Sequence, residues 1–587
     1  MELMLSGCLA IAAIVVPDMP TDVELSAAES LRDGIRRITG NDERIVKERD
    51  SGGGRLYFVG ATRAASGVSP SEWRPDEILV AKHSSGAIFA GHHTRGVIYA
   101  VDVYLEDVCG VRWWTSSESH YPKLKEMPLP SQIIRHAPVF RYRETYYRDG
   151  FKADFKVRSK GNFSSRTRFM YSPMEFIPEA KGGDHRLYFF AGRGSAYHSF
   201  FETLPPSVHF EKHPEWYSEI DGKRVKKQLC LTNDEMTRAY AAETLRRLRE
   251  NPAVDYISVS QNDWNGPCCC VKCKAVIEEE GAESGLYLRF VNKIAEAVER
   301  EFPNVMVDTF AYRFTRKPPK VARPRSNVTV RLCDIECAFN APIGSSRLNS
   351  DFLEDLKVWG KIAPGSLYIW DYTADFTSYM MPHPNLNSLG PNIRLFAENG
   401  VIGVFEQGDA LCSAGSFAAL EHWMISHLLW DPGRDAKALR DEFIRGYYGS
   451  AAASHVMECR DIVDGAGEAA AERGVKIGCY HLTVTNFMDK ATALAASKKL
   501  DDAILSAKAD GELYVRRLLR EKLSFDHMKI VSWDQWQLPG SKRDAVLRWI
   551  DDCRSFGVEA WRETTDKTDF GKYCRKLLAS VGVLTDC

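Results

Sequence analysis

The first 130 residues combine short apolar runs with two helical patterns. Strand-like runs cover residues 9–16, 56–59, 78–81 and 87–90, and helical patterns cover 23–38 and 94–108. In the first helical pattern the apolar positions recur at the spacing of one buried helix face: Ala27, Leu31, Ile35 and Ile38. Gly40 follows as a stop signal. This part predicts a small α/β domain over residues 1–130.

From Pro138 the pattern changes to strands that alternate with helices. Strand-like runs occur at 139–142, 187–190, 228–231, 256–259, 305–310, 328–332, 367–370 and 402–405. Helical patterns occupy 234–250, 284–301, 350–362, 393–399, 417–429 and 436–447. Eight strands in a segment of this length predict a (β/α)8 TIM barrel over residues 131–430. The remaining residues, 431–587, have helical patterns only and predict an α-helical C-terminal domain.

Acidic side chains follow four of the later strand-like runs. They are Asp263, Asp334 with Glu336, Asp371 and Glu406. Because the carboxyl ends of barrel strands form the rim where chemistry takes place, we expect these groups to meet in one pocket. Hydrolysis of a glycosidic bond uses two carboxyl groups, one as acid and one as base or nucleophile. The pattern therefore predicts a glycosidase.

Asp263 is the predicted general acid. It follows Asn262 directly, and burial would keep its carboxyl group protonated until it meets a leaving group. The Asn262 amide is expected to orient a substrate acetamido group or the partner carboxylate. The alternative is that Asp263 only caps the following loop or helix.

Glu336 is the predicted partner of Asp263. Because side chains alternate along a strand, Asp334 and Glu336 are expected to point the same way as a close carboxylate pair. Two like charges hinder each other's ionisation, which suits acid and base work. The alternative is that one of the two bridges a rim arginine, such as Arg331 or Arg313.

Further residues at these strand ends are predicted to bind the sugar. They are Asn262, Trp264, Tyr312, Asp334, Trp370, Asp371, Glu406, His198 and Arg143. Aromatic faces stack on the apolar face of a sugar ring, while carboxylates hold its hydroxyl groups. For Asp371 and Glu406 a binding role is favoured over a reacting one. For His198, a structural role is the alternative.

A cysteine cluster, Cys268-Cys269-Cys270-Val-Lys-Cys273, follows the Asp263 segment. A structural zinc site needs four ligands, and no second cluster stands at a matching spacing. Unligated thiols are therefore favoured, with a metal that shapes the loop or a disulfide as alternatives. No metal and no cofactor is predicted for the reaction.

Composition removes several other classes of protein. The formal net charge of −2 gives no reason to expect nucleic acid or an anionic membrane as partner. The chain has no apolar run long enough for a transmembrane helix. The apolar residues 11–16 favour a buried strand over an export signal, so a cytoplasmic location is the default, and a periplasmic or secreted one is the alternative if the start is truncated. Signatures of nucleotide-binding loops, zinc metalloproteases and serine hydrolases are absent.

Several segments together resemble a known family. They are Val259-Ser-Gln-Asn-Asp263 with the cysteine cluster, Phe290-Val-Asn292, Phe310-Ala-Tyr312, His213-Pro-Glu-Trp216 and Phe443-Ile-Arg-Gly-Tyr-Tyr-Gly449. The chain resembles bacterial proteins with the domain of unknown function numbered 4838, which overlaps glycoside hydrolase family 163. Residues 27–40 and 96–114 resemble the α/β domain that precedes the barrel in family 67 α-glucuronidases and family 20 hexosaminidases.

The resemblance implies a retaining or inverting glycosidase acting on glycans, in the manner of the endo-β-N-acetylglucosaminidases of family 163. Family 20 relatives place an Asp-Glu pair at the fourth strand and use the acetamido oxygen of the substrate as nucleophile; this chain has Asn262-Asp263 there. An α-glucuronidase-like exo-enzyme and a non-catalytic carbohydrate-binding barrel are the alternatives. A carbohydrate is the expected partner, and the pattern predicts no oligomeric state.

Overall fold

The computed structural model describes residues 12–162, 175–183, 189–190, 197–252, 254–481 and 483–583. The chain divides into two compact units. The first contains the described residues up to Arg141 and those within 152–164 and 175–184. The second contains residues 142–151 and the described residues from 189 onward. The predicted boundaries at residues 130 and 430 stay predictions.

The first unit has a six-stranded mixed sheet. In spatial order its strands are β2 (Arg44–Lys47), β1 (Ala13–Val16), β3 (Leu56–Val59), β5 (Gly86–Gly91), β4 (Ile78–His83) and β8 (Ile134–His136). Pairing is parallel from β2 to β5, whereas β4 pairs antiparallel with β5 and β8. The unit also contains α2 (Arg63–Ser66), α3 (Gly96–Val103), β6 (Arg112–Trp113), β7 (Ser119–His120) and α4 (Ala153–Arg158). The strands expected at 56–59, 78–81 and 87–90 are confirmed as β3, β4 and β5.

Helix α1 (Asp22–Thr39) in the first unit follows from local sequence signals. The Thr21 hydroxyl oxygen accepts a hydrogen bond from the Glu24 N–H, and the Glu24 carboxylate accepts one from the Thr21 N–H, which satisfies backbone donors at the amino end. The predicted apolar face is buried. Gly40 ends the helix with a φ of 85°, a left-handed conformation that glycine adopts without strain.

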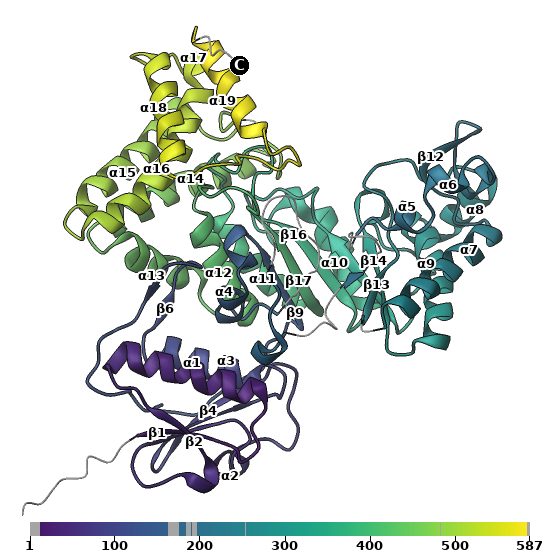
Figure 1. Ribbon diagram of the computed structural model, residues 1–587. Coiled ribbons are helices and arrows are strands. Elements are labelled where there is room, and N and C mark those ends of the chain that lie inside the picture. The colour runs from purple at the N-terminus through teal and green to yellow at the C-terminus, as the bar shows by residue number, and fades with distance from the viewer. Residues whose placement is uncertain are drawn as a thin grey trace, which may run out of the picture. The chain divides into compact units, whose positions relative to one another are not determined.

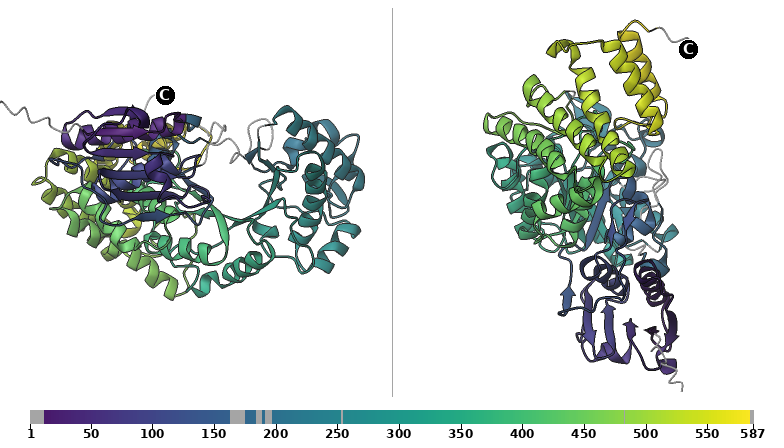
Figure 2. Two further views of the ribbon diagram at one scale, coloured as in Figure 1. Left: turned by 90° about the horizontal axis from the view of Figure 1, so that it is seen from below. Right: turned by 90° about the vertical axis from the view of Figure 1, so that its left-hand side faces the viewer.

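The second unit is built on a curled sheet of seven parallel strands (Figures 1 and 2). In spatial order they are β10 (Phe189–Phe190), β13 (Tyr256–Ser258), β14 (Met306–Ala311), β15 (Val328–Cys333), β16 (Leu367–Tyr372), β17 (Val401–Gln407) and β9 (Tyr142–Tyr146). Within the described residues, the edge strand β10 pairs only with β13, and the edge strand β9 pairs only with β17. The described residues thus show a curled parallel half-barrel sheet, and a complete barrel is not confirmed.

One predicted barrel strand was wrong. Residues 228–231 were expected to be the third strand of the parallel sheet. Instead β12 (Lys223–Leu229) pairs antiparallel with β11 (Tyr217–Ile220) in a separate two-stranded hairpin. The charged residues Lys223, Arg224, Lys226 and Lys227 occupy most of β12 and are exposed or half-buried, and only the end of the strand, from Gln228, is buried. Most of this strand is therefore too polar for the core of a barrel.

Helices follow most strands of the second unit. They are α5 (Phe200–Thr203), α6 (Pro206–His209), α7 (Asp234–Glu250), α8 (Val271–Glu280), α9 (Glu283–Glu301), α10 (Ser350–Ile362), α11 (Leu386–Glu398), α12 (Ala418–Trp430) and α13 (Ala436–Tyr448). A helical region completes the chain with α14 (Ala453–Glu472), α15 (Lys490–Ala507), α16 (Glu512–Val531), α17 (Trp533–Trp536), α18 (Lys542–Ser555) and α19 (Asp569–Ser580).

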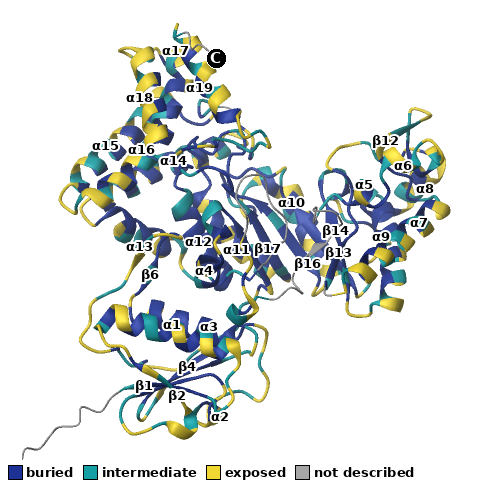
Figure 3. Ribbon diagram, viewed as in Figure 1, coloured by how far each residue is buried: buried dark blue, intermediate teal, exposed yellow. Residues whose placement is uncertain are grey.

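Strands and helices of the second unit differ in how far their residues are buried (Figure 3). The sheet strands β13–β17 are almost entirely buried, whereas helices such as α7 and α15 have one buried and one exposed face. None of the helices in the described parts of the chain has the length and apolar composition of a membrane-spanning helix.

Candidate active site

The segment after β13 carries the central carboxyl group, and buried amides hold it in place. Gln261 Nε2 donates hydrogen bonds to Tyr312 O and to Thr315 Oγ1, at 3.0 and 2.9 Å. These bonds join the end of β13 to the turn after β14. Asp263 follows on the surface, with 55% of its side chain exposed. The buried amides thus support an accessible carboxylate.

The Asn262 amide is used within the protein. Its Oδ1 accepts a hydrogen bond from the Phe201 N–H at 3.2 Å, and its Nδ2 donates to Lys227 O at 2.9 Å. Its main-chain groups pair with the Gln228 side chain. Asn262 is buried, so these bonds make it a support for the loop rather than a group that faces a ligand.

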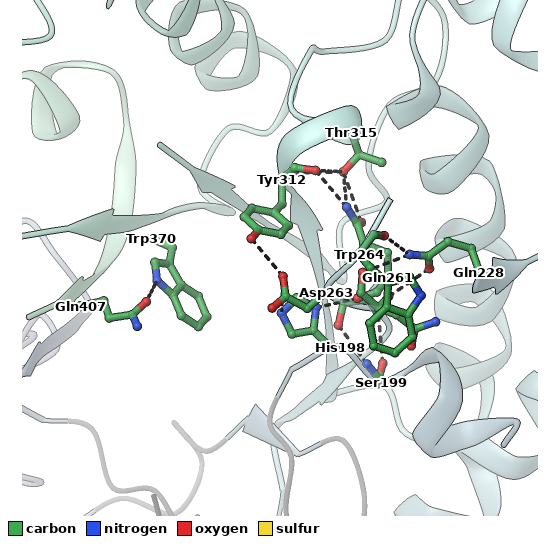
Figure 4. Close-up of polar contacts among 12 residues, drawn as sticks. His198, Ser199, Gln228, Gln261, Asp263, Trp264, Tyr312, Thr315, Trp370 and Gln407 are labelled. Carbon is green, nitrogen blue, oxygen red and sulfur yellow. Dashed lines mark hydrogen bonds and ion pairs between the residues drawn. The ribbon is translucent and has the colours of Figure 1, made fainter. Parts of the chain in front are cut away.

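Asp263 lies between a phenol and an imidazole (Figure 4). The Tyr312 hydroxyl donates to Asp263 Oδ1 at 3.0 Å, and His198 Nε2 lies 3.9 Å from the same oxygen. Burial and the Asp263 charge raise the pKa of Tyr312, so it stays a hydrogen-bond donor. This hydrogen bond fixes one oxygen of the Asp263 carboxylate.

The contacts of His198 define which of its nitrogens carries the proton. Nδ1 lies 2.7 Å from Gln261 O, and a carbonyl oxygen only accepts, so Nδ1 is the donor. In the neutral ring Nε2 is then an acceptor that faces Asp263. Burial lowers the pKa of His198, which favours this neutral form. His198 and Arg313, beside Tyr312, have φ values of 56° and 52°, a strained left-handed conformation that is frequent at functional sites.

A second carboxyl group comes from the C-terminal helical region. Glu563, between α18 and α19, accepts hydrogen bonds from Gln407 Nε2 and from the Tyr480 hydroxyl, both at 3.1 Å. Gln407 ends β17, and its Oε1 accepts from Trp370 Nε1 at 2.8 Å (Figure 4). This chain of hydrogen bonds places Glu563 over the carboxyl ends of β16 and β17.

Glu563 and Asp263 influence each other electrostatically. Burial raises the pKa of Glu563, and the Asp263 charge raises it further, although the bonds from Tyr480 and Gln407 act in the opposite direction. The Asp263 charge also acts on Tyr480. The two carboxyl groups therefore lie at one end of the sheet, and Glu563 is the one that burial favours in its protonated form.

Aromatic rings connect the two carboxyl groups. The Phe310 ring, on β14, lies 5.3 Å from the His198 ring and 5.7 Å from the Trp370 ring. Trp370 is partly exposed, and 43% of Trp264 beside Asp263 is exposed. Trp264 Nε1 donates to Lys227 O at 2.6 Å, which holds the indole in place. Partly exposed, fixed rings of this kind suit a flat ligand.

Three of the predicted binding carboxylates lie on the opposite face of the sheet. Asp371 is paired in register with Glu406, and its neighbour Trp370 with Phe405. Because side chains alternate across a strand, Asp371 and Glu406 point away from the face that carries Trp370. Glu406 and Asp334 are completely buried, and Asp371 nearly so. The structure thus places Asp371 and Glu406 on the face opposite Trp370, and Asp334 interacts with both.

Asp334, Asp371 and Glu406 form a buried carboxyl cluster. Asp371 interacts with both of the others. Burial and the Asp371 charge raise the pKa values of Asp334 and Glu406 well above their usual range, and burial raises that of Asp371 to about 6. Shared protons among these groups remove the repulsion that three charges would cause.

The expected pairing of Asp334 with Glu336 was wrong. The strand β15 ends at Cys333, so the alternation of side chains does not extend to Glu336, which lies in a turn. Glu336 is 43% exposed and accepts a hydrogen bond from Arg316 Nη1 at 2.7 Å. The alternative from the sequence was that one of the two carboxylates pairs with a rim arginine. The structure shows such a pair, but the arginine is Arg316 and not Arg331 or Arg313.

Arg143 lies on the face of the sheet opposite to Trp370. Its guanidinium packs over the Trp430 ring of α12, 5.4 Å from the ring centroid, and the side chain is buried. Arg143 shares its sheet face with Glu406 and Thr145 rather than with Trp370. The cation therefore packs against a helix.

A family model described as "Domain of unknown function (DUF4838)" matches residues 113–461. The chain belongs to the DUF4838 family. The matched residues include the segments that carry Asp263, Tyr312, Trp370 and Gln407. No curated protein sequence matches the chain.

Solved structures that are similar to this DUF4838 protein are glycoside hydrolases. A family 89 glycoside hydrolase from Clostridium perfringens, bound to its substrate GlcNAc-alpha-1,4-galactose, has a TM-score of 0.54 at 10% identity over 94% of this chain and 70% of that one. The same kind of enzyme bound to 2-acetamido-1,2-dideoxynojirmycin has a TM-score of 0.53 at 11% identity, over 95% and 70%. A family 138 enzyme targeting pectin rhamnogalacturonan II has a TM-score of 0.43 at 8% identity, over 96% and 74%.

Sequence reasoning missed Glu563, Tyr480 and Gln407 in this DUF4838 protein. Gln407 directly follows Glu406 at a strand end, so the alternation of side chains was a signal that could have identified it. Glu563 and Tyr480 lie in the helical C-terminal part, outside the predicted barrel, and no local pattern marks them. Only the folded chain brings them to the sheet.

Proposed function

We propose that this protein is a glycoside hydrolase whose active site lies at the carboxyl ends of β13, β14, β16 and β17. The observation that carries the proposal is the presence of two interacting carboxyl groups, Asp263 and Glu563, with Trp264 and Trp370 beside them. Two carboxyl groups in different environments are what acid and base catalysis of glycoside hydrolysis requires. The fold, shared with glycoside hydrolases, supports the proposal. We further propose that the curled sheet belongs to a (β/α)8 barrel.

Glu563 is proposed as the general acid and Asp263 as the ionised partner. Burial raises the pKa of Glu563, which favours the protonated form that a leaving group needs. Tyr312 donates a hydrogen bond to Asp263 Oδ1, which holds this carboxylate in place. The sequence alone suggested Asp263 as the acid, so this assignment changes its role. Glu563 also takes the place of Glu336 as the second carboxyl group, because Glu336 pairs with Arg316.

The proposed substrate is a glycan with an N-acetylhexosamine unit. The resemblance to family 163 points to this class, and family 89 structures with the same fold are described with GlcNAc-containing or 2-acetamido ligands. Ionised Asp263, fixed by Tyr312, has the charge to hold an acetamido N–H or to activate a water molecule. Trp264, Trp370 and Tyr312 are proposed to hold the sugar.

A uronate substrate is the second candidate. The Arg313 guanidinium lies 5.1 Å from the centroid of the Tyr312 ring, and its charge acts on His198. A cation beside the proposed site is what an α-glucuronidase-like enzyme would use to bind a carboxylate on the sugar. Nitrophenyl glucuronides therefore belong in the test panel.

The test is hydrolysis of nitrophenyl N-acetylhexosaminides, nitrophenyl glucuronides and an N-glycan by the wild-type protein and three variants. Asp263→Asn and Glu563→Gln are expected to lower kcat by about 100- to 10,000-fold, the usual contribution of acid and base groups. Glu336→Gln serves as the matched variant that retains activity. Thermal unfolding of each variant checks that the fold is intact.

Leaving-group dependence separates the two roles. A dinitrophenyl glycoside needs little protonation, so Glu563→Gln is expected to lose much less activity on it than on a mononitrophenyl glycoside. Asp263→Asn is expected to lose activity equally on both. The reverse result would assign the acid to Asp263, and equal activity of all variants with the wild type would refute the proposed site.

A further inference from the structure

Four cysteine thiols from two distant segments meet in the second unit. Cys230 follows the hairpin strand β12, whereas Cys268, Cys270 and Cys273 come from the loop before α8 and its first turn. All four are buried, and their sulfur atoms lie within 4.8 Å of one another. Cys230 Sγ is 3.8 Å from Cys270 Sγ and 3.9 Å from Cys273 Sγ.

These separations match the edges of a tetrahedron around a metal ion. With a zinc–sulfur bond of about 2.3 Å, the sulfur atoms of a tetrahedral site lie about 3.8 Å apart. A disulfide would bring two of them to about 2.0 Å. The cysteines of the cluster are all free thiols in the structure. The arrangement is therefore that of a four-sulfur metal site, and not of a bridged pair.

The surroundings of the cluster stabilise negative charge on sulfur. The Glu219 N–H donates to Cys268 Sγ at 3.3 Å, and Arg224 Nη1 lies 3.9 Å from the same sulfur. Cys270 is the N-cap of α8, so the positive end of the helix dipole faces this cysteine and Cys273. Hydrogen bonds and positive charge of this kind support the thiolates that bind a metal.

We propose that Cys230, Cys268, Cys270 and Cys273 bind one zinc ion in a structural site. Binding releases the thiol protons to solvent and leaves four thiolates on the ion. All four positions of a tetrahedral ion are taken by protein sulfur, so no position is left for a water molecule or a substrate. The site is therefore structural and separate from the reacting groups at Asp263 and Glu563.

The zinc would join the two segments that hold the Asp263 loop. The carbonyl oxygen of Lys227 on β12 accepts hydrogen bonds from Asn262 Nδ2 and from Trp264 Nε1. Cys230 lies just beyond the end of this strand, and Cys268 just beyond the loop. A metal bond between the two would keep Lys227 opposite Asn262 and Trp264, and thus limit motion of the loop.

The test is the metal content of the purified full-length chain, prepared without chelator and measured by inductively coupled plasma mass spectrometry. About one zinc per chain is expected. Cys273→Ser and Cys230→Ser are expected to lower this to a small fraction. Cys269→Ser is the matched control, because Cys269 is adjacent in sequence but exposed and outside the cluster, and it is expected to retain the zinc.

Cobalt substitution gives a readout that does not depend on the variants. Protein stripped of metal under reducing conditions and titrated with Co²⁺ is expected to develop the visible bands and the sulfur-to-cobalt charge-transfer band of a tetrahedral four-thiolate complex. Limited proteolysis of the stripped protein is expected to cut within residues 260–275 faster than in the zinc-loaded protein.

Three results would overturn the proposal. The first is a chain with no zinc that also develops no thiolate bands with cobalt. The second is equal loss of zinc from Cys269→Ser and Cys273→Ser. The third is stoichiometric iron in place of zinc, which would contradict the choice of metal. Activity is not part of this test, so its outcome is independent of the glycosidase proposal.

Discussion

The Tyr312 hydroxyl donates a hydrogen bond of 3.0 Å to Asp263 Oδ1, from the end of β14 to the loop after β13. Gln261, two residues before Asp263, donates in turn to the Tyr312 carbonyl. The two bonds fix the carboxylate relative to the neighbouring strand. A hydrogen bond to a carboxylate oxygen is stronger than one between neutral groups, so Tyr312 holds Asp263 firmly in place.

Tyr312→Phe is expected to lower kcat/KM by about 10- to 100-fold, the usual worth of a hydrogen bond to a charged group. The Asp263 carboxylate loses the donor that fixes its position, so the loss is expected mainly in kcat. The measurement is steady-state kinetics on a nitrophenyl glycoside. A kcat/KM equal to that of the wild type would show that this bond does not position a group needed for activity.

Tyr480→Phe is the contrasting variant, since its hydroxyl bonds to Glu563 instead of Asp263. That hydrogen bond lowers the pKa of Glu563, so removal of the Tyr480 hydroxyl is expected to raise the pKa of Glu563. The protonated acid then persists to higher pH. In a profile of kcat/KM against pH on a nitrophenyl glycoside, the alkaline limb is expected to move to higher pH while the acid limb stays in place. Movement of the acid limb in this variant would contradict the assignment of Glu563 as the acid.

Trp370→Ala is expected to raise KM by about 5- to 30-fold, in line with the loss of an aromatic contact of ~1–2 kcal/mol. Trp370→Phe retains a ring but loses the N–H that donates to Gln407 Oε1. It is therefore expected to change KM less. Steady-state kinetics on one substrate give both values, and equal KM values for wild type and Trp370→Ala would exclude stacking at this ring.

The buried carboxyl cluster predicts a stability that falls as pH rises. Burial raises the pKa of Asp371 to about 6, above its value of about 3.9 in an unfolded chain. A raised pKa in the folded state means that the stabilisation is complete below about pH 4 and is lost as pH rises through about 6. Asp371→Asn has no proton to lose, so it is expected to gain about 1–3 kcal/mol relative to wild type between pH 4 and 8.

The measurement for Asp371→Asn is the unfolding midpoint in denaturant at several pH values. The matched control is Asp551→Asn, because the Asp551 side chain is 74% exposed on α18. Its stability is expected to follow that of wild type at every pH. A stability difference for Asp371→Asn that is constant with pH would mean that Asp371 does not bind an extra proton in the folded protein.

Asp308 and Arg331 form an ion pair inside the curled sheet, at 3.5 Å and without exposed surface. Asp308→Ala leaves the Arg331 charge buried without this partner and is expected to destabilise the protein by about 3–5 kcal/mol. Replacing both residues by apolar ones removes the uncompensated charge, so the double variant is expected to lose less stability than the single one. Denaturant unfolding compares them, and additive losses would rule out coupling.

Local sequence patterns were sufficient for most elements of the fold. The bounds expected for α7 and α10, 234–250 and 350–362, agree with the structure. Asn233 caps α7, and such signals act within a few residues. The hairpin β11–β12 was not recognised, because the apolar end of β12 looks the same in sequence whether it pairs in a hairpin or in a barrel.

The candidate site was only partly predictable. Asp263 and Tyr312 were identified because each follows a strand of the sheet, and Trp370 because it lies near the end of β16. For Asp371 and Glu406 the alternation of side chains was visible, but a sequence does not say which face is covered by helices. Glu563 could not be found, because its role depends on where the helical region packs.

The amino-acid sequence alone determined most of the strands and helices and the acidic residues that follow or end them, because hydrophobic spacing and capping act between residues that are near each other in the chain. The tertiary structure alone decided which carboxyl groups meet and which four cysteines share one centre. Those choices depend on interactions between residues that lie far apart in sequence, such as the electrostatic interaction of Asp263 with Glu563 and the close approach of Cys230 to Cys273. Packing of the sheet against its helices sets these contacts, and no local pattern encodes them.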